Sequence, residues 1–202
     1  MSIKVIVFDF DGTLIDSNRF KHEAFFEVFP DDEHHAQTVR AVLAYMNEQS
    51  RFVILAEVLQ RLGMDQGPGL DARVKELARR YNDIVLDGAK NCPEMPGAET
   101  MLASLSQRYR LYLSSMTPHE ELKDIVRYRN WGGYFEDTYG YPHQKAATIE
   151  HIMGREDVGP RQVVVVGDGN SDRQSAEANA CFFVPVTPDF NLGDLAHIIE
   201  DL

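Results

Sequence analysis

The sequence lacks the features that mark membrane, secreted and nucleic-acid-binding proteins. No stretch approaches the roughly 18 consecutive apolar residues of a membrane-spanning helix. The apolar N-terminal stretch is interrupted by Asp9 and has no small-residue cleavage site, so it does not fit a signal peptide. Positive charge is scarce, with 20 Lys and Arg against 32 Asp and Glu. The net charge of −12 argues against nucleic acid or an anionic membrane as a partner.

Cysteine is almost absent as well. Cys92 and Cys181 are far apart and lack the spacing of a metal site, which is typical of a protein from the reducing cytoplasm. The 202 residues, 44% of them apolar, suit one soluble α/β domain with an insertion, or two small domains. Residues 17–90 hold 10 Lys and Arg against 12 Asp and Glu, so most of the negative charge falls on the rest of the chain. An anionic ligand would therefore bind the acidic part through a metal.

The most informative stretch is Val5–Phe8 with the residues that follow it. This β-branched and aromatic run predicts a strand buried on both faces, as in a parallel sheet. Asp9 and Asp11 come next, and ligands of open α/β sheets bind beyond the carboxyl ends of the strands. Two crowded carboxylates at that place indicate a Mg²⁺ site. The alternative is a β-hairpin that turns at Asp11–Gly12, with residues 13–15 as the returning strand.

Residues 17–88 show helical spacing only. Apolar side chains recur every three or four positions in four groups, which predict four helices and no strand. The groups lie at residues 20–29, 39–46, 55–62 and 74–85. A proline-bearing segment, Lys90–Gly97, predicts a linker. We therefore expect a core formed by residues 1–16 and 89–202, and an inserted all-helical cap formed by residues 17–88.

Beyond this linker, short apolar runs alternate with helical patterns. Strands are expected at residues 111–113, 137–139, 162–166 and 182–184, each followed by a helix. Strands that alternate with helices form a parallel sheet with right-handed crossovers. The predicted fold class is therefore α/β, a Rossmann-like parallel-sheet core with an all-helical cap inserted after its first strand.

Polar residues follow the later strands too. Ser114 and Ser115 come after the second strand, Lys145 opens the helix after the third, and Gly167–Asp172 follows the fourth. In a parallel sheet these residues lie at the same edge as the first two aspartates. Each alone has an ordinary explanation, because serines cap helices, Asp-Gly forms turns and lysines are commonly solvated. Their order on successive strand ends indicates phosphoryl transfer, which depends on positioning and charge stabilisation.

Four segments resemble, in order, the motifs of the haloacid dehalogenase superfamily. They are Asp9–Thr13, the strand that ends in Ser115, Lys145, and Gly167–Asp172. The resemblance covers essentially the whole chain and is to the phosphatase branch with a helical cap after the first strand, as in phosphoglycolate phosphatases. It implies a Mg²⁺-dependent phosphatase that acts on a small phosphorylated metabolite. Four ordered motifs also make the hairpin interpretation much weaker.

The resemblance implies a role for each acidic motif residue. Asp9 would attack phosphorus and form an aspartyl-phosphate, while Asp11 would serve as general acid and then as base. Mg²⁺ would be bound by the Asp9 carboxylate, the Asp11 backbone carbonyl and Asp168. Asp172 would complete the metal site from its outer shell or orient Lys145. The true dehalogenases of the superfamily lack the second aspartate, so Asp11 argues against that activity.

Ser115 and Lys145 would hold the phosphate oxygens, and Gly12 would let the backbone approach closely. Ser114 stays an alternative to Ser115, because successive residues that leave a strand point to opposite sides. We favour Ser115, since residues 115–118 resemble the Ser-x-Thr-Pro variant of the superfamily's second motif.

In the cap, Arg51 is the candidate contact to a second anionic group on the substrate, with Arg19 and Lys21 as alternatives, although the ordinary explanation for each of them is a solvated surface residue. Three other functions fit parts of the pattern. A sugar-phosphate mutase would use the same nucleophile but return the phosphoryl group to the sugar. A receiver-type signalling domain would carry its phosphoacceptor on a later strand and lack the helical insertion. A catalytically inactive scaffold is disfavoured because every motif residue is intact.

Overall fold

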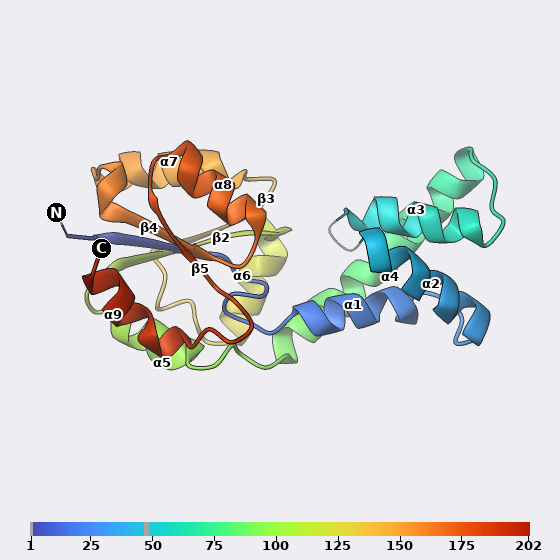
Figure 1. Ribbon diagram of the computed structural model, residues 1–202, viewed down its shortest axis with the longest axis horizontal. Helices are drawn as coiled ribbons and strands as arrows, with labels where there is room; N and C mark the ends of the chain where they lie inside the picture. The colour runs from blue at the N-terminus through green and yellow to red at the C-terminus, as the bar shows by residue number, and fades with distance from the viewer. Residues whose placement is uncertain (1, 47–48) are drawn as a thin grey trace. The chain divides into compact units, whose positions relative to one another are not determined.

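The computed structural model describes residues 2–46 and 49–202, which form two compact units. The first, here called the core unit, contains the chain up to Ser17 together with Ala89–Leu202. The second, here called the helical unit, is Asn18–Gly88. Figure 1 shows the elements of both.

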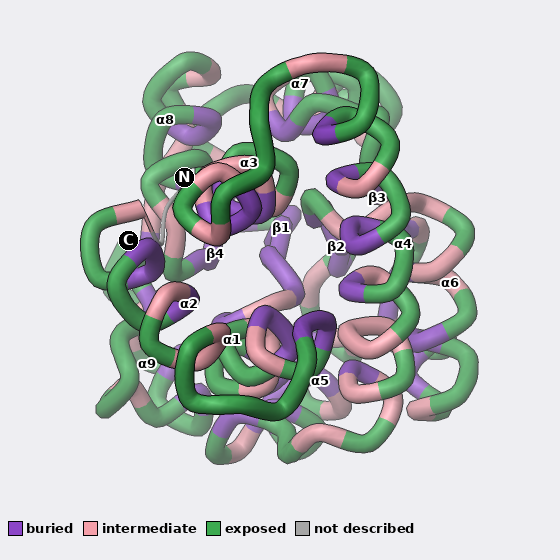
Figure 2. Tube along the Cα trace, turned by 90° about the vertical axis from the view of Figure 1, so that its right-hand side faces the viewer, coloured by how far each residue is buried: buried purple, intermediate pink, exposed green. Residues whose placement is uncertain are grey.

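The core unit is built on a parallel sheet of five strands in the order β3-β2-β1-β4-β5. Its central strand β1 pairs with β2 and β4, so that Val7 lies opposite both Tyr112 and Val165. Every residue of β1 and β4 is buried, as expected for strands covered on both faces (Figure 2). The predicted α/β fold is therefore confirmed. The strands are β1 (Val5–Phe8), β2 (Arg110–Pro118), β3 (Asp137–Tyr141), β4 (Val163–Gly167) and β5 (Phe182–Pro185).

Helices cover both faces of this sheet (Figure 1). The chain runs from β1 to β3 in one direction and then crosses to β4 and β5 on the other side of β1. Because such crossovers are right-handed, the two groups of connecting helices lie on opposite faces. One face carries α5 (Ala98–Leu105), α6 (His119–Tyr128) and α9 (Leu195–Glu200), and the other carries α7 (Lys145–Glu156) and α8 (Asn170–Ala178). Short 3₁₀ turns occupy Pro160–Gln162 and Leu192–Asp194.

The helical unit has its own hydrophobic core, which includes Phe25, Val42, Leu55 and Leu77. The four predicted helices are present, and no strand occurs in residues 18–46 and 49–88. The Ser50 hydroxyl accepts a hydrogen bond from the Val53 backbone and so caps the third helix. The helices are α1 (Asn18–Glu27), α2 (Glu33–Met46), α3 (Arg51–Arg61) and α4 (Pro68–Asn91), and the end of α4 from Ala89 on belongs to the core unit.

Two segments differ from the prediction. Helix α4 continues through Lys90 and Asn91, where a linker was expected. The cause is Arg129, whose guanidinium donates to the carbonyl oxygens of Ala89 (2.8 Å) and Cys92 (2.5 Å) and so supplies partners for the carbonyls at the helix end.

Strand β2 is also longer than expected, because an irregularity between Ser114 and Pro118 lets it keep pairing with β3. The hairpin at Asp11–Gly12 does not form. Both edges of β1 are already paired, and the chain turns at Gly12, whose φ of 74° suits glycine.

Candidate active site

The carboxyl ends of β1 and β4 form the point at which the strand order changes direction. Asp9 directly follows β1, and its backbone N–H still donates to the carbonyl of Val166 in β4 at 2.9 Å. Asp168 directly follows β4. Ligands of open α/β sheets bind in the crevice at this switch point. The fold therefore places two of the predicted acidic residues where a ligand is expected.

Three carboxylates meet at this point. One oxygen each from Asp9, Asp168 and Asp172 lies within 4.8 Å of the others. The Thr13 hydroxyl fixes Asp168: it donates to Asp168 Oδ1 at 3.2 Å and accepts from the Asp168 backbone N–H at 3.1 Å. Gly167 makes room for the Asp172 side chain, because a Cβ at this glycine would lie 2.4 Å from Asp172 Cγ.

Lys145 joins two of these acids. It is the first residue of α7, and its buried ammonium nitrogen lies 2.8 Å from Asp9 Oδ1 and 2.6 Å from Asp172 Oδ1. Asp172 Oδ2 accepts the backbone N–H of Gly169 at 3.1 Å. Both oxygens of Asp172 thus have partners in the protein, which points to an orienting role for this side chain.

The pKa shifts follow from burial and charge. Burial raises the pKa of Asp9 to about 7, with Lys145 opposing the shift and Asp172 adding to it. Burial likewise raises the pKa of Asp172 against the opposing charge of Lys145. Burial disfavours the charged form of Lys145, but the two carboxylates outweigh it and raise its pKa. The group thus holds three carboxylates and one ammonium group, an excess of negative charge that favours a further cation.

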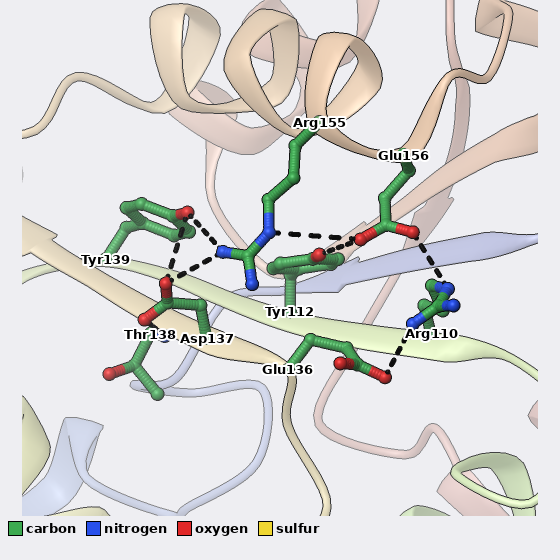
Figure 3. A network of polar contacts seen from close by, with 8 residues as sticks. All are labelled: Arg110, Tyr112, Glu136, Asp137, Thr138, Tyr139, Arg155 and Glu156. Atoms are coloured by element: carbon green, nitrogen blue, oxygen red, sulfur yellow. Dashed lines mark hydrogen bonds and ion pairs between the residues drawn. The ribbon is translucent and has the colours of Figure 1, made fainter.

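The far end of α7 is fixed by a network of polar contacts (Figure 3). Glu156 accepts a hydrogen bond from the Tyr112 hydroxyl, and its other oxygen lies 2.8 Å from Arg110 Nε. Arg155 donates to Asp137 Oδ2 at 2.9 Å. These bonds join the C-terminal end of α7 to β2 and β3. They hold the helix whose first residue is Lys145.

Asp11 lies outside the three-carboxylate group. Its Oδ2 accepts the Thr117 hydroxyl at 2.7 Å. Asp11 is expected to bind the metal through its backbone carbonyl. Its side-chain carboxylate can therefore keep the hydrogen bond to Thr117. Ser115 is buried, and its oxygen accepts the Thr117 backbone N–H at 3.0 Å. Ser114 is buried too, and it lines, with Asp9 and Lys145, a gap that is too small to hold a water molecule.

The predicted cap contacts lie in the helical unit. Arg51 begins α3, with its guanidinium 5.4 Å from the centre of the Phe52 ring. Its buried Nε has no hydrogen-bond partner among the described residues. Arg19 forms an ion pair with Glu23 at 2.8 Å, and the Lys21 backbone carbonyl accepts the Tyr81 hydroxyl. The role of Arg51 in substrate binding stays a prediction.

The sequence alone indicates no role for Thr13 and Thr117, which contact Asp168 and Asp11 in the structure. Thr13 could have been suspected from the sequence, because it directly follows Gly12, at the turn after β1. Thr117 had a weaker signal, because its contact with Asp11 depends on the irregular end of β2. Among the described residues, no helix has the length and apolar character needed to cross a membrane.

Comparison with known proteins decides the family. The chain matches the haloacid dehalogenase-like hydrolases over residues 6–186, a range that contains every motif described above. The chain belongs to this family. It is 25% identical over 201 residues to the phosphoglycolate phosphatase of Vibrio cholerae serotype O1, covering 96% of this chain and 88% of the relative.

Two solved structures share the fold. A predicted phosphoglycolate phosphatase from Haemophilus somnus 129PT superposes with a TM-score of 0.74 at 19% identity, covering 98% of each chain. The HAD-hydrolase YfnB from Bacillus subtilis, bound to magnesium, also has a TM-score of 0.74 at 14% identity, covering 99% of this chain and 100% of that one.

Proposed function

We propose that this haloacid dehalogenase-like hydrolase is a Mg²⁺-dependent phosphatase that acts on a small phosphorylated metabolite. The observation that carries the proposal is the meeting of Asp9 and Asp168 at the switch point, with Lys145 bound to Asp9. This arrangement offers a nucleophile, a cation site and a fixed positive charge within one crevice. Phosphoryl transfer requires these three elements, since its catalysis is mainly positioning and charge stabilisation.

The donor set fits Mg²⁺. All three groups in the acidic cluster are carboxylate oxygens, which are the ligands that this hard cation prefers. We assign Asp9, Asp168 and the Asp11 backbone carbonyl as ligands. Asp172, whose oxygens bind Lys145 and a backbone N–H, orients Lys145 beside the metal site. When bound, Mg²⁺ neutralises charge on the phosphoryl group. The magnesium in the Bacillus subtilis relative supports Mg²⁺ as the cation.

The reaction runs in two balanced steps. An Asp9 carboxylate oxygen bonds to phosphorus while the bond from phosphorus to the ester oxygen breaks, and Asp11 gives its proton to the departing alkoxide. In the second step, water bonds to phosphorus and gives a proton to Asp11. The bond between phosphorus and Asp9 then breaks, which releases phosphate and restores both carboxyl groups.

Ser115, Lys145 and the backbone at Gly12 bind the phosphate oxygens. Lys145 suits this role, because Asp172 holds its ammonium group at 2.6 Å and keeps it beside the nucleophile. The positive φ of Gly12 lets the turn after β1 present its backbone without a side chain in the way. These contacts recognise the phosphoryl group, which all substrates share.

The substrate is expected to be a small phosphate monoester, and 2-phosphoglycolate is the first to test, because curated relatives are phosphoglycolate phosphatases. The test is a phosphate-release assay over a panel of phosphorylated metabolites, with Mg²⁺ and with excess chelator. We expect Mg²⁺-dependent release from at least one small ester. Formation of an isomerised sugar phosphate without free phosphate would show that the enzyme is a mutase and not a phosphatase. Full activity in excess chelator would contradict the proposed metal site.

A further inference from the structure

Thr117 is a polar residue at the site to which the proposed mechanism gives no role. It lies near the end of β2, and its hydroxyl donates to Asp11 Oδ2 at 2.7 Å. A hydroxyl that donates to a carboxylate at this distance forms a charge-assisted hydrogen bond, which is stronger than one between neutral groups. The bond joins residues 106 positions apart in the sequence, so it depends on the fold and not on local chain geometry.

The backbone of Thr117 is fixed on both sides of this hydroxyl. Its N–H donates to the Ser115 oxygen at 3.0 Å, within the irregular end of β2. Its carbonyl oxygen packs so closely on Gly140 of β3 that a Cβ there would lie 2.4 Å away. At that point Pro118 still pairs with Tyr141. The hydroxyl is therefore presented from a rigid position.

We propose that Thr117 is a positioning residue that holds Asp11 in the orientation required of a general acid. The proposal rests on the phosphatase function given above. The Asp11 side chain can rotate about two bonds, and the Thr117 bond selects one orientation by holding Oδ2. The other oxygen, Oδ1, is then the one that we assign to the leaving group. A group that must deliver a proton loses much of its effect when it is misplaced by about 1 Å.

This role predicts a dependence on the leaving group. In the first step the ester oxygen takes a proton from Asp11 as its bond to phosphorus breaks. Phenol has a pKa of about 10, like the tyrosine side chain, so phenolate is a poor leaving group and needs this proton. The much more acidic p-nitrophenol leaves readily as an anion and needs it far less. The two esters otherwise differ only by a nitro group on the ring.

The experiment measures kcat/KM of the full-length protein with Mg²⁺ on phenyl phosphate and on p-nitrophenyl phosphate. This ratio reports the steps up to release of the alcohol, so the base role of Asp11 in the second step does not enter it. Thr117→Val keeps the β-branched shape but removes the donor. We expect about a tenfold loss on phenyl phosphate, as for removal of one hydrogen bond, and less than a threefold loss on p-nitrophenyl phosphate.

Two further variants separate positioning from packing. Thr117→Ser keeps the hydroxyl and should restore activity on phenyl phosphate to within about threefold of wild type. Thr117→Ala should repeat the selective loss, which also covers the case in which the valine variant fails to fold. The matched control is Thr138→Val in β3, which should leave both esters within twofold.

Three results would overturn the proposal while the wild type remains an active phosphatase. Thr117→Val could lose the same activity on both esters, or it could keep full activity on phenyl phosphate. Thr117→Ser could also fail to restore activity on phenyl phosphate. A selective loss in Thr138→Val would overturn it as well. If the wild type hydrolyses neither ester nor any member of the metabolite panel, the phosphatase function itself fails, and this proposal fails with it.

Discussion

The ammonium nitrogen of Lys145 lies 2.8 Å from Oδ1 of Asp9, and both side chains are buried. The proposed nucleophile is thus bound directly to the first residue of α7. The opposite end of that helix is tied to β2 and β3 through Glu156 and Arg155 (Figure 3). Elements of the core unit therefore hold this charge beside the nucleophile.

Replacing Lys145 should impair every substrate alike, because the ammonium group is proposed to bind the phosphoryl group. Lys145→Ala should lower kcat/KM roughly ten- to a hundredfold on all esters tested, as expected when a charge-assisted hydrogen bond is removed. It should also destabilise the fold by about 3–5 kcal/mol, since it leaves Asp9 and Asp172 without their cation. The control is Lys75→Ala on the exposed side of α4, which should change neither quantity measurably. Normal turnover of any one ester by Lys145→Ala would contradict the assignment.

Mg²⁺ should stabilise the protein more strongly as the pH rises. Folding raises the pKa of Asp9 from 3.8 to about 7, so the folded state keeps this proton to higher pH than the unfolded chain. Without metal, ionisation of Asp9 therefore costs stability as the pH rises from about 4 to 7. Mg²⁺ binds the ionised form and offsets this cost, so the Tm gain on adding Mg²⁺ should grow between pH 5 and pH 8.

The control for this measurement is Asp168→Asn, which removes a proposed ligand but leaves Asp9 and Lys145 in place. Its Tm should respond little to Mg²⁺ at any pH, whereas its activity should be lost. A Tm gain in wild type that is constant across the range, or equally large in Asp168→Asn, would show that Mg²⁺ does not bind at this group.

Gly167 and Gly154 should respond to alanine in opposite ways. A Cβ at Gly167 would meet Asp172 Cγ at 2.4 Å, so Gly167→Ala must displace the residue that orients Lys145. We expect it to cost about 1–3 kcal/mol and most of the activity. Gly154 lies on the exposed side of the last turn of α7, with no atom within 4 Å of the added carbon. Gly154→Ala should stabilise the protein by about 0.5–1 kcal/mol, and a thermal melt of both variants tests the contrast.

Arg51 tests whether the helical unit selects the substrate. If the guanidinium binds a second anionic group, Arg51→Ala should raise KM on 2-phosphoglycolate and reduce kcat/KM roughly ten- to a hundredfold. It should leave p-nitrophenyl phosphate, which has no second anionic group, nearly unaffected. Arg40→Ala, on α2 and paired with Glu33, is the matched control. If Arg51→Ala affects both esters equally, Arg51 does not recognise a second anionic group on the substrate.

Much of the fold could be predicted because its central strands carry a strong pattern. Residues of β1 and β4 are apolar at every position, which identifies strands buried on both faces. The end of β2 has no such pattern. Beyond Ser114, the strand pairs with β3 again only at Pro118, after an irregularity and beside the closely packed Gly140. The last turn of α4 depends likewise on Arg129, 40 residues from Ala89. Contacts at such separations cannot be read from local periodicity.

The same distinction applies to the site. Asp9 and Asp168 could be placed together because each follows a strand of a parallel sheet. The bond between Thr117 and Asp11 could not be predicted, because it depends on the irregular path of β2. Whether Asp172 contributes an oxygen to a metal or orients Lys145 was open from the sequence, and the two hydrogen bonds to its carboxylate now favour the second role.

The most direct test of the account is to identify the atom that carries the phosphoryl group during turnover. The wild-type enzyme is mixed with Mg²⁺ and its best ester, quenched in acid within milliseconds, reduced with borohydride and digested for mass spectrometry. An aspartyl-phosphate is reduced to homoserine, whereas a free aspartate is not. We predict homoserine at position 9, absent without substrate and absent in Asp9→Asn, which should also release no phosphate. Rapid phosphate release with unmodified Asp9, or by folded Asp9→Asn, would contradict the account.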